Sequence, residues 1–116
     1  MSNVSIFTRI MNGDIAGDIV FEDEHCIVLN DLHPQAPVHM LVIPRKPLVS
    51  LAQLEHTDAP LLGHLMLVAS EVAKNAGIGN GFRLIANNGR SAGQTVFHLH
   101  FHVLGGSHFS EAGLNQ

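Results

Sequence analysis

The stretch "TVFHLHFHVLGG", Thr95 to Gly106, places a histidine at every second position with a large apolar residue in each gap. Side chains on a β-strand alternate between the two faces of the sheet. The spacing therefore predicts a strand over 95–104 that carries His98, His100 and His102 on one face. The apolar residues of the stretch share the other face, which we expect to be core: Phe97, Leu99, Phe101 and Val103.

Three interpretations of the histidine row are open. A solvated strand face usually carries Thr, Lys and Glu, so solvation alone is a poor reason for three histidines in register. Two histidines two residues apart can bind Zn²⁺, with His39 as an outside ligand. However, the outer two of a straight row do not converge on one ion, so we assign no metal ligand. Catalysis fits best, because neutral imidazole is a nucleophile and transfers protons near pH 7.

The composition of the whole chain limits the classes of protein. Its 116 residues suit one domain, and 46% of them are apolar. A net charge of −4 without a basic run argues against electrostatic binding of nucleic acid. Cys26 is the single cysteine, and we see neither a signal peptide nor a membrane-length apolar run. We expect a soluble cytoplasmic protein that binds no membrane.

Local patterns predict five strands and two helices. A helical spacing of apolar residues begins at Ile6 and ends at Asn12-Gly13. A longer apolar stripe predicts a helix from Asp58 to Ala76, with Thr57 as its cap and Gly77 as its stop. We expect strands at 19–22, 26–30, 39–43, 81–88 and 95–104, with a loop at 89–94. The predicted fold class is α+β, with a mostly antiparallel five-stranded sheet, one long helix and one short helix.

The segment His98-Leu-His100-Phe-His102-Val-Leu resembles the signature of the histidine triad (HIT) family, in which three histidines alternate with apolar residues. The segments "IFTRIMNGDIAGDIVFEDE", "NDLHPQAPVHMLVIPRK" and "FRLIANNGRSAGQTV" are similar to the Hint branch, the nucleoside phosphoramidases. "Leu-Gly-Gly" after the triad also favours this branch. The resemblance covers Ile6 to Gly106 of a single domain, 1–116, and the tail 107–116 departs from it.

The resemblance implies an enzyme that cleaves nucleoside 5′-phosphoramidates of the adenosine type to a nucleoside monophosphate and an amine. It implies a purine nucleotide substrate like AMP, a homodimer in which the long helix forms the interface, and no cofactor. Two alternatives remain. One is hydrolysis of dinucleoside polyphosphates, and the other is a nucleotide-binding regulatory protein without catalysis. Arg90 is the one fixed cation in the motif segment, which favours a single phosphoryl group over a polyphosphate chain.

The resemblance assigns roles to the histidines. His100 is the nucleophile that forms a nucleotidyl-histidine, with its other ring nitrogen bonded to a backbone carbonyl near His98. His102 contacts the phosphate and helps to protonate the leaving amine. His98 supports the row, and His39 is the fourth histidine of the network. Two further catalytic positions complete this set: Asn87, on the phosphate side, and Thr95, where relatives commonly have Ser.

Substrate binding is assigned in the same way. Asp31 matches the carboxylate that accepts bonds from the ribose hydroxyls, although an Asp before Pro34 also suits a turn. The backbone N–H groups of Gly93 and Gln94 would bind phosphate oxygens. The base pocket would be lined by apolar residues, which ordinary core packing would also explain: Ile6, Phe7, Ile10, Leu29 and Leu32.

Overall fold

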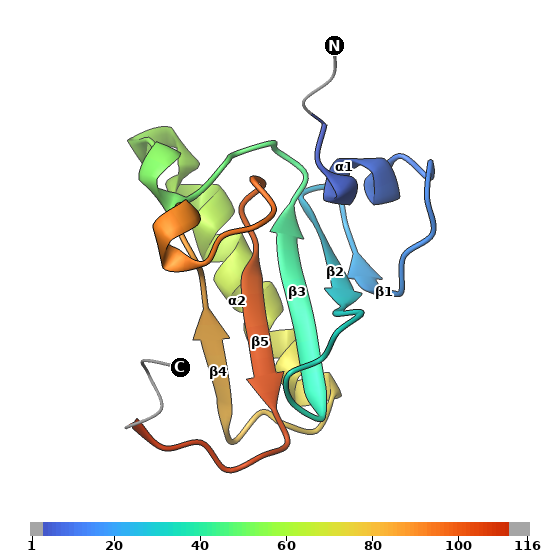
Figure 1. Cartoon of the computed structure of the whole chain (residues 1–116), viewed down its shortest axis with the longest axis vertical. Coiled ribbons are helices and arrows are strands. Elements are labelled where there is room, and N and C mark those ends of the chain that lie inside the picture. The colour runs from blue at the N-terminus through green and yellow to red at the C-terminus, as the bar shows by residue number, and fades with distance from the viewer. Residues whose placement is uncertain (1–3, 112–116) are drawn as a thin grey trace.

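A five-stranded sheet in the order β1-β2-β3-β5-β4 organises residues 4–111, the part of the chain that the structure, a computed structural model, describes (Figure 1). All four neighbouring pairs of strands are antiparallel. This confirms the predicted α+β class. The strands are β1 (Ile19–Glu22), β2 (Cys26–Asn30), β3 (Val38–Pro44), β4 (Phe82–Ile85) and β5 (Phe101–Gly105).

The long helix α2 (Ala59–Asn75) covers one face of the sheet (Figure 1). Its buried stripe packs against the strand residues that point to this side, and together they form the larger core. The helix members are Leu65, Val68, Ala69, Val72 and Ala73, and the strand members include Val28, Met40, Val42, Phe101 and Val103. Among the described residues, no helix is long and apolar enough to span a bilayer.

The C-terminal end of α2 agrees with the sequence prediction, and the N-terminal end differs from it. Gly77 adopts a φ of +81°, the left-handed conformation that a residue after a helix commonly takes, so the predicted stop is confirmed. The predicted cap Thr57 is wrong, because it lies inside a short 3-10 helix over His56–Asp58. The side chains of Glu55 and Asp58 bond reciprocally to each other's backbone N–H groups. This arrangement precedes the α-helix and replaces the expected threonine cap.

The short helix α1 (Ile6–Met11) lies against the opposite face of the sheet. Ser5 caps this helix, and its hydroxyl accepts a hydrogen bond from the Thr8 N–H. Phe7 is the buried residue of α1 and belongs to a second, smaller apolar cluster with four strand residues: Ile27, Leu29, Leu41 and Ile43. The sheet therefore has core on both faces, and α1 covers only part of its face.

The predicted strand over 95–104 is correct only for its second half. β5 begins at Phe101, opposite Val42, and continuing the ladder would require the backbone N–H that Pro44 lacks. The chain bends at 96–98 and instead bonds to the loop after β3, where the Leu99 N–H donates to the Leu48 carbonyl at 2.7 Å.

The expected core position of Phe97 is therefore also wrong, because the bend breaks the alternation of faces. Its ring is 44% exposed and lies 5.4 Å from the guanidinium carbon of Arg90. Leu99, Phe101 and Val103 are buried as predicted.

β4 is shorter than the predicted strand 81–88 and ends at Ile85. The two asparagines that follow bond to the loops around them rather than to a strand. Asn87 Nδ2 donates to the Ala92 carbonyl at 2.9 Å, and Asn88 Oδ1 accepts from the Leu51 N–H at 2.8 Å. Asparagine side chains commonly replace ladder bonds in this way at the ends of strands.

Candidate functional site

His100 and His102 lie side by side on the face of the sheet opposite α2, with ring centroids 5.1 Å apart. The Nδ1 atom of His100 is 2.8 Å from the backbone carbonyl oxygen of His98. A carbonyl oxygen only accepts, so this ring nitrogen must carry the proton. In the neutral ring the Nε2 atom of His100 therefore holds a lone pair, which is the form a nucleophile requires.

His39 sets the protonation of His102. The backbone N–H of Gln35 donates to His39 Nδ1 at 3.0 Å, so the proton of the neutral His39 ring lies on Nε2. That Nε2–H donates to His102 Nδ1 at 2.9 Å. Asp31 Oδ2 lies 3.4 Å from the Nε2 atom of His39. The proton of a neutral His102 is consequently on Nε2, so this ring presents a donor where His100 presents an acceptor.

The environment keeps these rings neutral. Burial lowers the pKa of His102 to about 4, helped by the charges of His100 and His39 and opposed by the carboxylate of Asp31. Burial also lowers the pKa of His39, again against the opposing effect of Asp31. At neutral pH the His39–His102 pair is uncharged, as the assigned tautomers require.

His98 is the most enclosed of the three triad histidines, with 2% of its surface exposed. Its Nε2 donates to the Pro44 carbonyl at 2.7 Å, and its Nδ1 lies 2.8 Å from the Ser5 hydroxyl. Burial and the charge of His100 lower its pKa, while the bond to Pro44 acts in the opposite direction. This ring faces protein on both of its nitrogens and acts as part of the framework.

The structure places Asp31 with the histidines and leaves Asn87 in the loop after β4. Asp31 Oδ1 accepts from the His33 N–H at 2.8 Å, and its other oxygen faces His39. The side chain of Asn87 bonds to the loop that carries Gly93. Gly93 has a φ of +91°, and a Cβ added there would lie 3.7 Å from Asn87 Nδ2. Thr95 is exposed just before the bend.

The N–H groups of Gly93 and Gln94, which are expected to bind phosphate oxygens, have partners within their own loop. Both donate inside the loop, to the Arg90 and Gly89 carbonyls respectively, each at 3.1 Å. The buried side chain of Gln94 also acts within the protein, donating to the Val49 and Val96 carbonyls.

The residues assigned to the base pocket separate into two groups. Phe7 and Leu29 are buried in the smaller core cluster, and Ile10 packs against it. Ile6 is 46% exposed and Leu32 is 78% exposed. The first three therefore pack between α1 and the sheet, and the other two lie on the surface.

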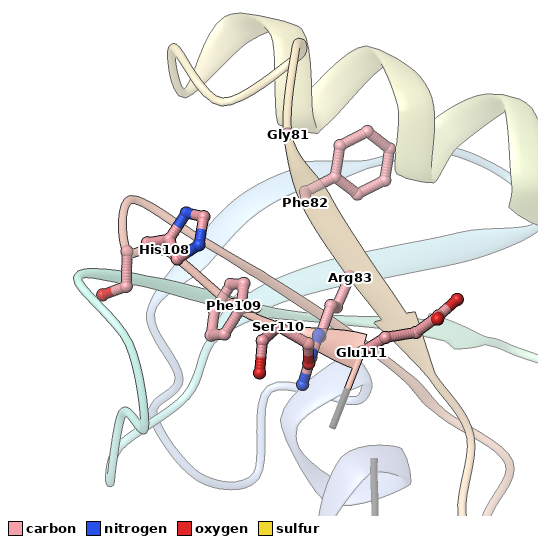
Figure 2. Close-up of a pocket in the computed structure, with 8 residues that line it drawn as sticks. Gly81, Phe82, Arg83, His108, Phe109, Ser110 and Glu111 are labelled. Carbon is pink, nitrogen blue, oxygen red and sulfur yellow. The ribbon is translucent and has the colours of Figure 1, made fainter. Parts of the chain in front are cut away.

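Two surface hollows of about 400 Å³ lie among the described residues. One touches the candidate site, because Asp31 and His39 belong to its lining. The other lies between β4 and the chain after β5, where Arg83 lies 4.7 Å from the ring centroid of Phe109 (Figure 2). None of the residues predicted to act in the site lines this second hollow.

Within residues 4–111, two groups of side chains present donor atoms close enough together to hold a metal ion. Asp31, His39 and His102 form the first group, and their donor atoms already bond to one another. Asp23, Cys26 and His64 form the second group, on the α2 side. Burial raises the pKa of the Cys26 thiol to about 12, which keeps it in the form that binds metals poorly.

Comparisons with known proteins identify the family of this chain. A family model of the HIT domain matches residues 12–109. The chain belongs to the HIT domain family.

Relatives of this chain share most of its length. An uncharacterized HIT-like protein of Synechocystis is 53% identical over 110 residues, covering 95% of this chain and 96% of the relative. A solved HIT family hydrolase from Clostridium thermocellum has a TM-score of 0.92 at 36% identity, covering 98% of this chain and 100% of that one. For a HIT family hydrolase from Legionella pneumophila the TM-score is 0.90 at 34% identity, with coverages of 93% and 97%. This protein therefore has the fold of the HIT family hydrolases.

Sequence reasoning missed three groups that hydrogen-bond to these rings: Ser5, Gln35 and the Pro44 carbonyl. Ser5 could have been found as a helix cap, since a serine precedes the helical spacing at Ile6. Its contact with His98 spans 93 residues, and no local pattern signals such a contact.

Proposed function

We propose that this protein is a hydrolase of nucleoside 5′-phosphoramidates, which it cleaves to a nucleoside monophosphate and an amine. The observation that carries the proposal is the pairing of opposite tautomers. His100 holds a lone pair on Nε2, and His102 beside it holds a proton on Nε2. Attack at phosphorus needs the first group, and stabilising a phosphoryl oxygen or a leaving group needs the second.

The reaction proceeds in two displacements at the phosphorus atom. The Nε2 lone pair of His100 forms a P–N bond, and the bond from phosphorus to the substrate amine breaks. The departing amine takes up a proton, and the nucleotide remains on the His100 ring. Water then attacks the same phosphorus, the P–N bond to His100 breaks with return of its electron pair, and the water proton is released. A second displacement from the opposite side leaves the histidine unchanged.

His102 acts as a donor in both steps. Its Nδ1 already accepts the His39 proton, so its Nε2–H is the group left to bond a phosphoryl oxygen or pass a proton towards the amine. The hydrogen bond from Nδ1 of His100 to the His98 carbonyl stabilises the positive charge that develops on the attacking ring.

Asp31 is assigned to the ribose hydroxyls. Its Oδ1 accepts from the His33 N–H and its Oδ2 faces His39, so each oxygen keeps a lone pair for a hydroxyl donor. Phe7, Ile10 and Leu29, which pack between α1 and the sheet, are assigned to the apolar wall against which the purine base would lie.

Charge favours a single phosphoryl group over a polyphosphate chain. The sequence has six Lys and Arg residues, and three of them, on or directly after strands, bond to other protein groups. Arg45 bonds to Glu22, Lys46 to Asp58, and Arg83 to the Ser110 carbonyl. A tetraphosphate usually requires several cations or Mg²⁺.

The test compares two substrates, an adenosine 5′-phosphoramidate and a dinucleoside tetraphosphate, with the wild type and with His100→Ala. We expect cleavage of the phosphoramidate, lowered at least about a thousand-fold in the variant because the covalent route is lost. His56→Ala is the matched control, since that histidine is exposed on the 3-10 helix before α2. Adding EDTA should leave the rate unchanged.

Other outcomes decide between the alternatives. Cleavage of the tetraphosphate alone would support the polyphosphate hydrolase, and binding of AMP without turnover of either substrate would support a regulatory protein. Rapid acid quenching of wild-type enzyme should also yield a protein whose mass is increased by one nucleotidyl group.

We also propose that the protein is a homodimer that uses α2 and β4. Leu67 on α2 is 66% exposed, and Leu84 on β4 is exposed on the same side of the sheet because it pairs with the core residue Val103. Large apolar side chains exposed on neighbouring elements are typical of a surface that a second copy covers.

A further inference from the structure

The first turn of α1 brings two hydroxyl groups to the buried ring of His98. The Ser5 hydroxyl oxygen lies 2.8 Å from His98 Nδ1, and the Thr8 hydroxyl oxygen lies 3.4 Å from the same nitrogen. The proton of the neutral His98 ring is on Nε2, because that atom donates to the Pro44 carbonyl at 2.7 Å. Nδ1 is therefore an acceptor, and Ser5 is the donor of the short bond.

Ser5 is prepared for this donation by its position as the helix cap. Its oxygen accepts from the Thr8 N–H at 3.2 Å, which leaves the hydroxyl proton to point at the histidine. One side chain thus caps the start of α1 and donates to the unprotonated nitrogen of His98.

The ring of His98 is connected to the nucleophile through its own peptide group. The His98 carbonyl accepts from His100 Nδ1 at 2.8 Å, and the N–H of the same peptide unit, on Leu99, donates to the Leu48 carbonyl at 2.7 Å. Phe7, between the two hydroxyl residues in sequence, packs edge to face against both rings, with centroids 6.0 Å from His98 and 5.1 Å from His100. A change in the position of the His98 ring would move the carbonyl that orients the His100 ring.

We propose that Ser5 is a positioning residue for the reaction, whose hydroxyl holds His98 as the neutral Nε2–H tautomer and thereby keeps the lone pair of His100 aimed at the substrate. Thr8 supplies a second, longer hydroxyl contact to the same nitrogen. This inference rests on the proposed function, because it concerns the geometry of the His100 nucleophile. It also states a property of His98 that is measured without any substrate.

The two roles of Ser5 are separated by substituting it in three ways in the full chain. Thr at this position both caps the helix and donates a hydroxyl proton. Asp caps a helix as well as Ser does, but its carboxylate has no proton to donate. Ala removes both the cap and the donor.

We expect Ser5→Asp and Ser5→Ala to lower kcat for the phosphoramidate about ten-fold at pH 7, with KM unchanged within about two-fold. Ser5→Thr should retain the wild-type rate. The pKa of His98, followed by NMR of its imidazole nitrogens, should rise in the Ala variant and rise further in the Asp variant. The reason is that the Ser5 hydroxyl, which donates to Nδ1 in this arrangement, stabilises the neutral ring, whereas a carboxylate favours the cation. The charge of His100 also acts on this titration, so the series is repeated in His100→Gln.

The proposal is overturned if Ser5→Asp keeps both the wild-type kcat and the wild-type His98 titration, since the hydroxyl would then act only as a helix cap. An equal loss of rate in Ser5→Thr would overturn it as well. If His100→Ala retained full turnover, the proposed function would fail, whereas the NMR result on His98 would still stand or fall separately.

Discussion

At the scale of single residues, protonation of four imidazoles is determined by partners that carry only donors or only acceptors. Backbone carbonyls fix the proton of His98 and that of His100 by accepting it. A backbone N–H fixes His39 by donating, and His39 then fixes His102. Because each ring has one determined tautomer, His100 and His102 would not exchange the proposed roles of nucleophile and donor.

This arrangement predicts that the protein loses stability in mild acid. The pKa values of His39, His98 and His102 are all lowered on folding, that of His102 from 6.5 to about 4. Between these two values the unfolded chain takes up protons that the folded protein excludes. The free energy of unfolding should therefore decrease as the pH falls from 6.5 towards 4, by up to about 1.4 kcal/mol per pH unit for His102, and the lowered pKa values of His39 and His98 act in the same direction.

Urea unfolding at pH 7.5, 6, 5 and 4.5 measures this slope. His102→Asn should reduce it, and the exposed His56→Ala should leave it unchanged. A free energy of unfolding that is constant over this range would contradict the neutral, buried state of the three rings.

Asp31 allows a second prediction at this scale. Asp31→Asn should raise KM for the phosphoramidate about ten-fold with kcat within about three-fold, because an amide replaces an acceptor that faces the ribose diol. Asp14→Asn, an exposed position in the loop after α1, is the control. A fall in kcat at unchanged KM would place Asp31 in the relay with His39 and contradict the ribose assignment.

At the scale of elements, the start of β5 is decided by its neighbour. Continuing the strand before Phe101 would place the chain beside Pro44, which has no N–H for a ladder. The bend that results turns His98 towards Pro44 and Ser5, and Phe97 towards solvent.

A matched pair of phenylalanines tests this bend. Phe101→Ala should lower the free energy of unfolding by about 3–5 kcal/mol, because it leaves a cavity in the larger core. Phe97→Ala should lower it by less than about 1 kcal/mol, since the ring is exposed and lies beside the Arg90 guanidinium. Urea unfolding of both variants gives the comparison, and equal losses would show that the strand continues to Thr95.

At the scale of the whole molecule, the sheet separates the larger core from the histidines. One face is occupied by α2 and the larger core, and the other carries α1, the smaller core and the histidines. The exposed apolar side chains of α2 and β4 therefore lie on the side away from the candidate site, where a second copy would not block it.

The dimer proposal makes a prediction about mass. The wild type should behave in light scattering as twice the 12.5 kDa chain, and Leu67→Glu should shift it to the single-chain mass. A charge placed in an apolar interface is expensive to bury, so the loss should be strong. Asn75→Glu at the exposed end of α2 is the control. A wild-type protein of single-chain mass would end this proposal.

The sequence by itself determined the α+β class, the two helices with the Gly77 stop, and the alternation that buries Leu99, Phe101 and Val103. These features depend on the period of apolar residues and on local backbone preferences, both of which are written in neighbouring positions.

Only the tertiary structure decided where β5 begins, which loop N–H groups are already used, and which nitrogen of each histidine carries the proton. The physical reason is that each of these depends on a hydrogen-bond partner from another segment. Ser5 and His98 are 93 residues apart, and Pro44 and His98 are 54 apart. A bond between such residues exists only after the sheet has formed.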